Sequence, residues 1–379
     1  MTAPDVYSEL GLRRVVNAAT TLTALGGTVL PDEVLAAMAS AGGSCVSMEE
    51  LHVAAGRRLA ALTRNEAAYV TSGCAAAIVL SVLAAITGGR PDVIARLPYD
   101  ESLARNVVIH RIHRIPYDRA IELAGGHLVE IGNVIQTFPW ELEAAIDERT
   151  AAVFWVAGSH LPPSALSIEE TVEIAHARGV PVIVDGAAQL PPIENLWRFT
   201  VDAGADLALF SGGKALRGPQ ASGFMVGSAA LVEAARANGA PLQRLARAMK
   251  VGKEEVCGLL AAVERYTALD HSAILSDWEG TVDYWVSALA SIRGIAARRV
   301  ARNEAGQPVP RMEVSFDPDG VVSAREVADR LWDGDPRVAV LVERGSHLYV
   351  TPDTLSGPDE ATLVLERLRA VLVRCRGQS

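Results

Sequence analysis

The stretch Phe210-Ser211-Gly212-Gly213-Lys214-Ala215-Leu216-Arg217-Gly218-Pro219 decides how the rest of the chain is interpreted. It continues the apolar run 205–210, which is typical of a buried strand, so Lys214 leaves the predicted sheet on a glycine-flanked turn. A P-loop would need glycine at position 208 and serine or threonine at 215, and both positions are alanine. The remaining interpretation is a lysine that forms a Schiff base, which must be partly desolvated to react at neutral pH.

Partners for such a lysine occur upstream. The apolar run 180–185 ends in Asp185, which places a carboxylate at the carboxyl end of a predicted parallel strand, where ligands bind. That carboxylate suits a pyridinium nitrogen. Ser72 and Gly73 form the turn between another apolar strand and an apolar helix, and such a turn offers hydroxyl and N–H groups to a phosphate. Together with Lys214, these residues indicate pyridoxal phosphate as the cofactor.

Several longer runs carry a family resemblance. The runs 113–118, 189–196, 211–220 and 249–255 resemble the selenocysteine-synthase-like branch of the fold-type I pyridoxal-phosphate enzymes. Within that branch they are most similar to the D-glucosaminate-6-phosphate ammonia-lyase group, over about residues 10–270. The resemblance implies an aspartate-aminotransferase-like fold, with a mainly parallel central sheet and a smaller C-terminal α+β domain. It also implies a homodimer or a larger homo-oligomer.

The resemblance adds further candidate site residues. It aligns His113 with a family histidine near the site, a catalytic position, although a structural histidine is the alternative. His160 follows the predicted strand 151–156 and is expected to contact the cofactor or the substrate. Gln189, four residues after Asp185, and Ser211, beside the phosphate, are expected cofactor contacts.

A basic cluster stands out in an acidic protein. Its members are Arg217, Arg244, Arg247, Lys250 and Lys253. A solvated helix face explains such a cluster, and so does a site that holds an anionic substrate. Carboxylate-binding arginines of the wider fold often come from the region of Arg344, which is the last candidate for substrate binding.

These residues support a lyase hypothesis. Lys214 would remove the Cα proton of an amino acid or amino-sugar acid, a β-substituent would leave, and ammonia and a 2-keto product would be released. Racemisation, aldol cleavage and β-replacement begin in the same way and remain alternatives. A non-catalytic homologue that only binds the cofactor is an alternative of another class.

Composition narrows the classes of partner. The formal net charge of −10 argues against nucleic-acid binding, which requires a dense basic surface. The four cysteines Cys45, Cys74, Cys257 and Cys375 have no metal-ligand spacing, so we expect no metal and reduced thiols. The first residues lack the pattern of a signal peptide, and the longest apolar run, 74–86, is too short to span a bilayer. We therefore expect a cytoplasmic enzyme with a small-molecule substrate.

Strand and helix patterns alternate between residues 67 and 227, which predicts an α/β architecture. We expect an N-terminal arm at residues 1–30, a cofactor-binding domain at 31–250, and a linker helix with a small domain at 251–379. Strands are predicted at 67–70, 106–109, 127–131, 151–156, 180–185, 205–210, 222–226, 311–316, 338–341 and 347–350. Helices are predicted at 31–38, 47–62, 75–86, 139–146, 167–176, 251–269, 281–292 and 359–373.

Overall fold

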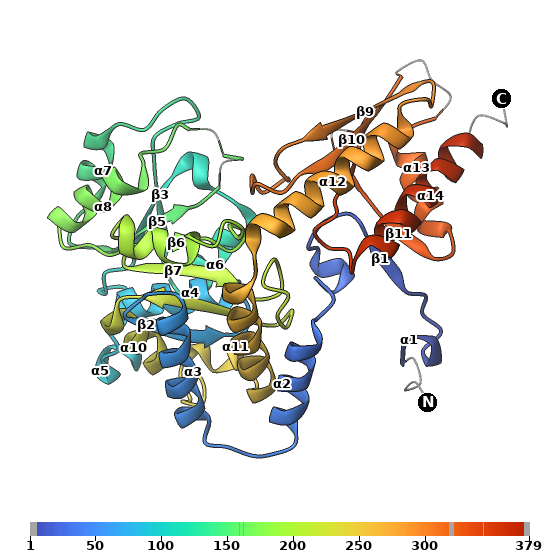
Figure 1. Cartoon of the computed structure of the whole chain (residues 1–379). Helices are drawn as coiled ribbons and strands as arrows, with labels where there is room; N and C mark the ends of the chain where they lie inside the picture. The colour runs from blue at the N-terminus through green and yellow to red at the C-terminus, as the bar shows by residue number, and fades with distance from the viewer. Residues whose placement is uncertain (1–5, 159, 162, 318–321, 344, 375–379) are drawn as a thin grey trace. The chain divides into compact units, whose positions relative to one another are not determined.

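The computed structural model describes residues 6–158, 160–161, 163–317, 322–343 and 345–374. These residues divide into two compact units (Figure 1). The large unit is Leu30–Leu269 with Ala305–Gln307, and the small unit is Met1–Val29, Asp270–Glu304 and Pro308–Ser379.

A seven-stranded sheet forms the middle of the large unit, and the seven apolar runs predicted there are its strands. Its order is β2-β8-β7-β6-β5-β3-β4. Only β8 runs antiparallel to its neighbours β2 and β7, and every other neighbouring pair is parallel. The strands are β2 (Ala67–Thr71), β3 (Asn106–His110), β4 (His127–Ile131), β5 (Thr150–Val156), β6 (Val182–Asp185), β7 (Leu207–Ser211) and β8 (Gly223–Gly227).

Both faces of the inner strands of this sheet are buried, whereas the edge strand β4 is partly exposed. Along β6, Val182 and Val184 belong to one hydrophobic cluster, while Ile183 belongs to the cluster on the opposite face. A strand with two covered faces reads as a continuous apolar run, which is why the sequence pattern identified these strands. The helices of the large unit are α2 (Asp32–Gly42), α3 (Met48–Leu62), α4 (Cys74–Thr87), α5 (Pro91–Ile94), α6 (Arg119–Leu123), α7 (Pro139–Ala145), α8 (Ile168–Ala177), α9 (Asn195–Trp197), α10 (Ala229–Asn238) and α11 (Lys253–Ala268).

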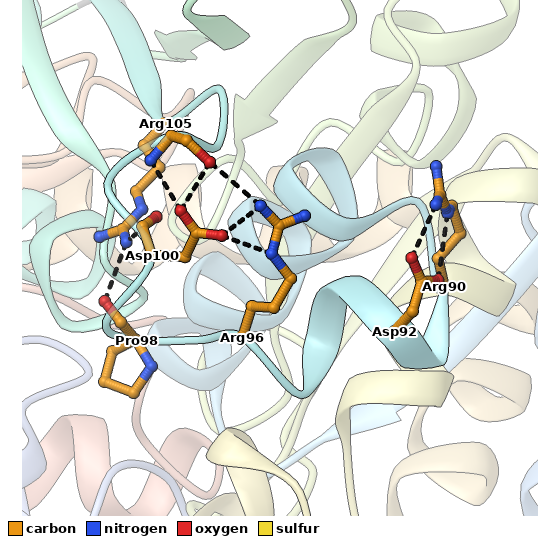
Figure 2. Close-up of polar contacts among 7 residues, drawn as sticks. Arg90, Asp92, Arg96, Pro98, Asp100 and Arg105 are labelled. Carbon is orange, nitrogen blue, oxygen red and sulfur yellow. Dashed lines mark hydrogen bonds and ion pairs between the residues drawn. The ribbon is translucent and has the colours of Figure 1, made fainter.

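The segment that leads into β3 is fixed by charged side chains, as Figure 2 shows. Arg105 is 3% exposed, and its guanidinium donates to the main-chain oxygens of Pro98, at 2.9 Å, and Asp100. Arg96 pairs with the Asp100 carboxylate. These contacts lie at the amino end of β3, whereas the histidine-bearing turn 111–113 follows its carboxyl end.

The small unit contains an antiparallel sheet of order β12-β13-β10-β9 and a parallel pair, β1 and β11. Trp285, Leu331 and Leu368 are buried in its core. Its elements are α1 (Val6–Glu9), β1 (Val15–Asn17), α12 (His271–Leu289), β9 (Ile295–Val300), β10 (Arg311–Phe316), α13 (Ala324–Asp333), β11 (Arg337–Ala339), β12 (Leu341–Glu343), β13 (His347–Val350) and α14 (Pro358–Arg374).

The unit boundary differs from the expected one near residue 250. Helix α11 belongs to the large unit, because Leu259 and Val263 lie in the same hydrophobic cluster as the central strands. The segment expected to form an N-terminal arm contains β1, which pairs with β11 and so belongs to the small unit. The segment Ala305–Gln307 lies between small-unit strands in the sequence but counts with the large unit.

Candidate active site

Lys214 lies on a compact turn after β7. The Gly212 N–H donates to the Ser222 carbonyl at 2.9 Å, and the Gly218 N–H donates to the Gly212 carbonyl at 2.8 Å. A Cβ atom on Gly212 would lie 2.1 Å from the Ser222 hydroxyl, so this position requires glycine. The turn therefore fixes the part-buried Lys214 directly beyond the carboxyl edge of the sheet.

Arg217 closes this turn in a strained conformation. Its N–H donates to the Lys214 carbonyl at 2.9 Å, and its φ of 54° lies in the left-handed region that most side chains avoid. Backbone strain of this kind costs about 1–3 kcal/mol and concentrates at functional sites. Arg217 thus serves first to shape the lysine turn, and its guanidinium role in substrate binding stays a prediction.

Asp185 ends β6 and is 5% exposed. Its Oδ1 accepts the Ala187 N–H at 3.0 Å and a weak bond from the Cys74 thiol at 3.9 Å. Burial raises the pKa of the Asp185 carboxyl, and the Ala187 N–H and the nearby Lys214 ammonium partly offset this rise. A buried carboxylate next to a lysine is the pair that a pyridinium ring and a Schiff base require.

Cys74 was not singled out by the sequence, and no motif could have identified its contact. Burial and the Asp185 carboxylate raise the pKa of its thiol well above the ordinary value. The thiol therefore stays protonated at neutral pH and acts as a weak donor to Asp185, not as a nucleophile.

The turn at Ser72 and Gly73 fits a phosphate group. Gly73 has φ of 87°, and a Cβ atom there would meet no heavy atom within 4 Å, so open space adjoins the turn. Within the described part of the chain, no side chain caps helix α4, which begins at Cys74. Uncapped N–H groups at the start of a 14-residue helix bind anions. Ser211 lies close by, because Gly223 pairs with both Ser211 and Thr71.

Gly223 supports this phosphate turn through a close backbone approach. A Cβ atom on Gly223 would lie 2.5 Å from the Gly73 carbonyl carbon and 2.6 Å from the Cys74 nitrogen. We predict that Gly223→Ala lowers the free energy of unfolding by about 1–3 kcal/mol, as overpacking does, and weakens cofactor binding. Denaturant unfolding and a cofactor titration measure the two effects. Gly280→Ala in α12 is the control, because its Cβ would meet nothing within 4 Å; equal behaviour of the two variants would contradict the prediction.

His113 lies on a short turn after β3 and is 3% exposed. Its Nδ1 accepts the Val156 N–H at 3.2 Å, and its ring meets the Trp155 ring edge-on at 5.1 Å. Burial lowers the pKa of His113 to about 3, with a smaller contribution from the His110 ring. The imidazole is therefore neutral near pH 7.

His160 and Gln189 meet at one main-chain oxygen. The Ala305 carbonyl accepts from the His160 Nδ1 at 2.7 Å and from the Gln189 Nε2 at 3.1 Å. Gln307 also donates to the Leu190 carbonyl. The segment Ala305–Gln307 thus contacts the two loops that follow β5 and β6. These contacts join residues more than 110 positions apart in the sequence, so no local motif could have predicted them.

The basic cluster separates into two groups in the structure. Arg247, Lys250 and Lys253 line a cavity of about 520 Å³, together with His52 and apolar side chains. Met249 connects this cavity to the phosphate turn, because its carbonyl accepts the Ser72 hydroxyl at 3.0 Å. Arg217 and Arg244 are not among these lining residues, and Arg244 directly precedes the short helical segment Leu245–Met249. Arg344 lies outside the described residues.

The described residues limit which classes of site the chain can form. Among the described residues, no group of three or more His, Cys, Asp and Glu side chains could hold a metal ion. None of the described helices has the length and apolar character needed to cross a bilayer. Cys45, Cys74 and Cys257 are free thiols, and Cys375 lies outside the described residues.

A family model described as L-seryl-tRNA selenium transferase matches residues 15–276, which include every candidate cofactor residue above. The chain belongs to this family. Three relatives differ in how much of each protein is shared. The D-glucosaminate-6-phosphate ammonia lyase of Salmonella typhimurium is 33% identical over 97% of this chain and 98% of its own length. A 5′-C-glycyluridine monooxygenase-decarboxylase of a Streptomyces species is 35% identical over 97% and 92%.

An L-seryl-tRNA(Sec) selenium transferase of Alkaliphilus metalliredigens is 30% identical over 71% of this chain and 60% of its own length. Solved structures agree with the family. The structure of D-glucosaminate-6-phosphate ammonia-lyase has a TM-score of 0.85 and 32% identity over 99% of this chain and 100% of that chain. A ureidoglycine-glyoxylate aminotransferase of Bacillus subtilis, at 16% identity and a TM-score of 0.62, shares the fold. The predicted fold-type I architecture is confirmed, and the chain is a pyridoxal-phosphate-dependent enzyme.

Proposed function

We propose that this chain is a pyridoxal-phosphate-dependent ammonia-lyase that acts on an anionic amino acid or amino-sugar acid. The observation that carries the proposal is the relation to D-glucosaminate-6-phosphate ammonia-lyase, which spans nearly the whole of both proteins in sequence and structure. The catalytic turn with Lys214 and the buried Asp185 are both present. A protein that only bound the cofactor would have no physical reason to keep a lysine beside a costly buried carboxylate.

Each part of the site has a role in this reaction. Bound pyridoxal phosphate supplies an electron sink for the bonds at the substrate Cα. Lys214 anchors the cofactor and, once freed by the substrate amine, takes the Cα proton on its Nζ. Asp185 holds the proton on the pyridinium nitrogen, while Ser72, Gly73 and Ser211 hold the phosphate. Elimination of the β-hydroxyl as water releases an enamine, which takes up water to give ammonia and a 2-keto product.

The cavity lining supports an anionic substrate. Arg247, Lys250 and Lys253 line one cavity in a chain whose net charge is −10, and among the described residues of that lining Glu255 is the acidic one. Lys253 is paired with the neighbouring Glu254, so Arg247 and Lys250 supply most of the positive charge for an anion. Guanidinium and ammonium groups recognise phosphate and carboxylate oxygens through charge-assisted hydrogen bonds. We therefore assign the substrate anion to this cavity.

A second candidate function is oxygen-dependent decarboxylation. It is favoured by the Streptomyces monooxygenase-decarboxylase, whose identity to this chain is 35%, against 33% for the ammonia lyase. A monooxygenase-decarboxylase consumes dioxygen and releases carbon dioxide, whereas the proposed elimination needs neither. The selenium transferases share less, since the chain spans about 60% of the length of the Alkaliphilus protein. A small-molecule substrate is therefore preferred over a tRNA.

The proposal predicts ammonia release from D-glucosaminate 6-phosphate. We expect stoichiometric ammonia and 2-keto product under nitrogen as well as in air. The unphosphorylated acid should react with a kcat/KM about 100-fold lower, because it lacks two or so charge-assisted bonds. A coupled ammonia assay and an oxygen electrode measure both. Reaction only with dioxygen, or none with any anionic amino-sugar acid or amino acid, would overturn the lyase assignment.

We also propose that the enzyme is cytoplasmic and forms a homodimer or a larger homo-oligomer. Exposed apolar side chains on and near α2 and α3 of the large unit, including Leu35, Val46 and Val53, support an assembly surface. Light scattering of the assayed preparation tests it, since a mass of 40.1 kDa would identify a monomer.

A further inference from the structure

Two histidines near the carboxyl edge of the sheet hold opposite tautomers. The main-chain N–H of Val156 can only donate, so the His113 Nδ1, 3.2 Å away, carries a lone pair and the ring proton sits on Nε2. The Ala305 carbonyl can only accept, so the His160 Nδ1, 2.7 Å away, carries a proton. The neutral His160 ring therefore presents a lone pair at Nε2.

The surroundings of the two rings differ as well. His113 is 3% exposed and its pKa is lowered to about 3, chiefly by burial, so it neither takes up nor delivers a proton near pH 7. His160 is exposed and can meet a substrate. Of the two, only His160 fits an acid–base group.

His160 is held in a defined orientation despite its exposure. A Cβ atom on Gly158 would lie 2.3 Å from the His160 Cε1, so the ring packs directly on the backbone of its own turn. On its Nδ1 side it shares the Ala305 carbonyl with Gln189, whose side chain is 8% exposed. Among the described residues, these contacts involve Nδ1 and Cε1 and give Nε2 no hydrogen bond.

The turn that carries His160 also starts beside the cofactor carboxylate. The Ala157 N–H donates to the main-chain oxygen of Asp185 at 2.9 Å, and His160 follows three residues later. Because β5 and β6 are parallel neighbours, their following loops lie at the same edge of the sheet, which is also the edge from which the Lys214 turn leaves β7. The loop that carries His160 thus lies at the same edge of the sheet as Asp185 and the Lys214 turn.

We propose that His160, through its Nε2, is the second acid–base group of the elimination, and that the Ala305 carbonyl and Gln189 position it. This assignment rests on the proposed lyase function. Lys214 takes the Cα proton, the bond between the β-carbon and the hydroxyl oxygen breaks, and the oxygen leaves with the electron pair. It takes from the His160 Nε2 a proton that the lone pair of this nitrogen first accepts from solvent, and it departs as water, which leaves His160 neutral again.

His160→Asn tests this role, because the asparagine amide nitrogen can replace Nδ1 as donor to Ala305 while nothing replaces Nε2. We expect kcat for ammonia release to fall about 10²–10⁴-fold, the usual contribution of an acid–base group, with KM changed only a few-fold. Exchange of the Cα proton in D₂O should persist, because Lys214 is intact. His160→Gln, which lacks the Nδ1 donor, should lose elimination in the same way.

His127→Asn is the matched control, since His127 is an exposed histidine at the start of β4, the opposite end of the strand from the candidate site, where its Nε2 lies 3.4 Å from the Glu101 Oε2. It should keep both rates. Wild-type ammonia release by His160→Asn would overturn the assignment, and so would the joint loss of exchange and elimination in a variant that retains cofactor absorbance. A wild-type protein that releases no ammonia would instead overturn the proposed function, and with it the role of His160.

Discussion

Lys214→Ala is expected to lower ammonia release to less than about one ten-thousandth of the wild-type rate, because it removes both the covalent anchor of the cofactor and the base for the Cα proton. The visible absorbance of the lysine-bound cofactor should disappear at the same time. Steady-state assays and a spectrum between roughly 300 and 500 nm measure the two losses.

A matched variant separates the chemistry of Lys214 from its charge. Lys214→Arg keeps a cation on the same turn but cannot form a Schiff base, so it should be as inactive as the alanine variant. Lys253→Arg, in the cavity lining, should retain the visible absorbance. If the Lys214→Ala protein kept the absorbance and turned over, the assignment of the catalytic lysine would be wrong.

Asp185→Asn is expected to reduce turnover by about 10²–10⁴-fold while the protein still folds and binds the cofactor. Asparagine is similar in shape, and its Oδ1 can still accept the Ala187 N–H. It cannot hold the proton on the pyridinium nitrogen, so electron withdrawal from the substrate Cα weakens. Asp185→Glu restores the carboxylate and should recover part of the rate; equal rates for the asparagine variant and the wild type would contradict the role.

The same substitution should change how stability depends on pH. Burial raises the pKa of Asp185, so the folded cofactor-free protein holds this proton more tightly than the unfolded chain does. The free energy of unfolding therefore falls as pH rises from the ordinary pKa of 3.8 through the raised value, and it loses no more from this group above that value. Relative to Asp185→Asn, the cofactor-free wild type should lose stability across this interval. If the difference in free energy of unfolding between the wild type and Asp185→Asn, measured by denaturant unfolding, did not change with pH, the raised pKa of Asp185 would be contradicted.

The sequence could predict the large unit because its signals are local. Each central strand is an uninterrupted apolar run that ends at a turn, and both faces of that strand are covered. Asp185 and Lys214 follow the parallel neighbours β6 and β7, so their meeting at one sheet edge followed from parallel topology. Gly73 reaches the same edge because the antiparallel β8 lies between β2 and β7, which the apolar pattern did not reveal.

The sequence patterns that predict secondary structure are weaker in the small unit than in the large unit. Strand β9 contains Arg298 and Arg299 and is no more than half-buried, so its pattern is neither apolar nor cleanly alternating. Helix α11 was expected to lie beyond the domain boundary, because length and periodicity do not reveal which core a helix joins. Tertiary packing decides it: Leu259 and Val263 of α11 pack in the hydrophobic core of the large unit.

The roles of the histidines were also beyond the sequence. His113 and His160 are both histidines near strand ends, and the sequence alone cannot say which ring nitrogen is protonated. The distinction depends on two main-chain groups, the Val156 N–H and the Ala305 carbonyl, and the second lies 145 residues from its partner. A local sequence motif cannot predict long-range contacts of this kind.

The most direct test of the account is to locate the cofactor attachment by borohydride reduction, proteolysis and mass spectrometry. Lys214, Lys250 and Lys253 are the three lysines of the chain, so the result distinguishes among few positions. The account predicts a reduced pyridoxyl group on the peptide that contains Lys214 and none on the other two. A label on Lys250 or Lys253 alone, or no label in protein incubated with pyridoxal phosphate, would contradict the central claim.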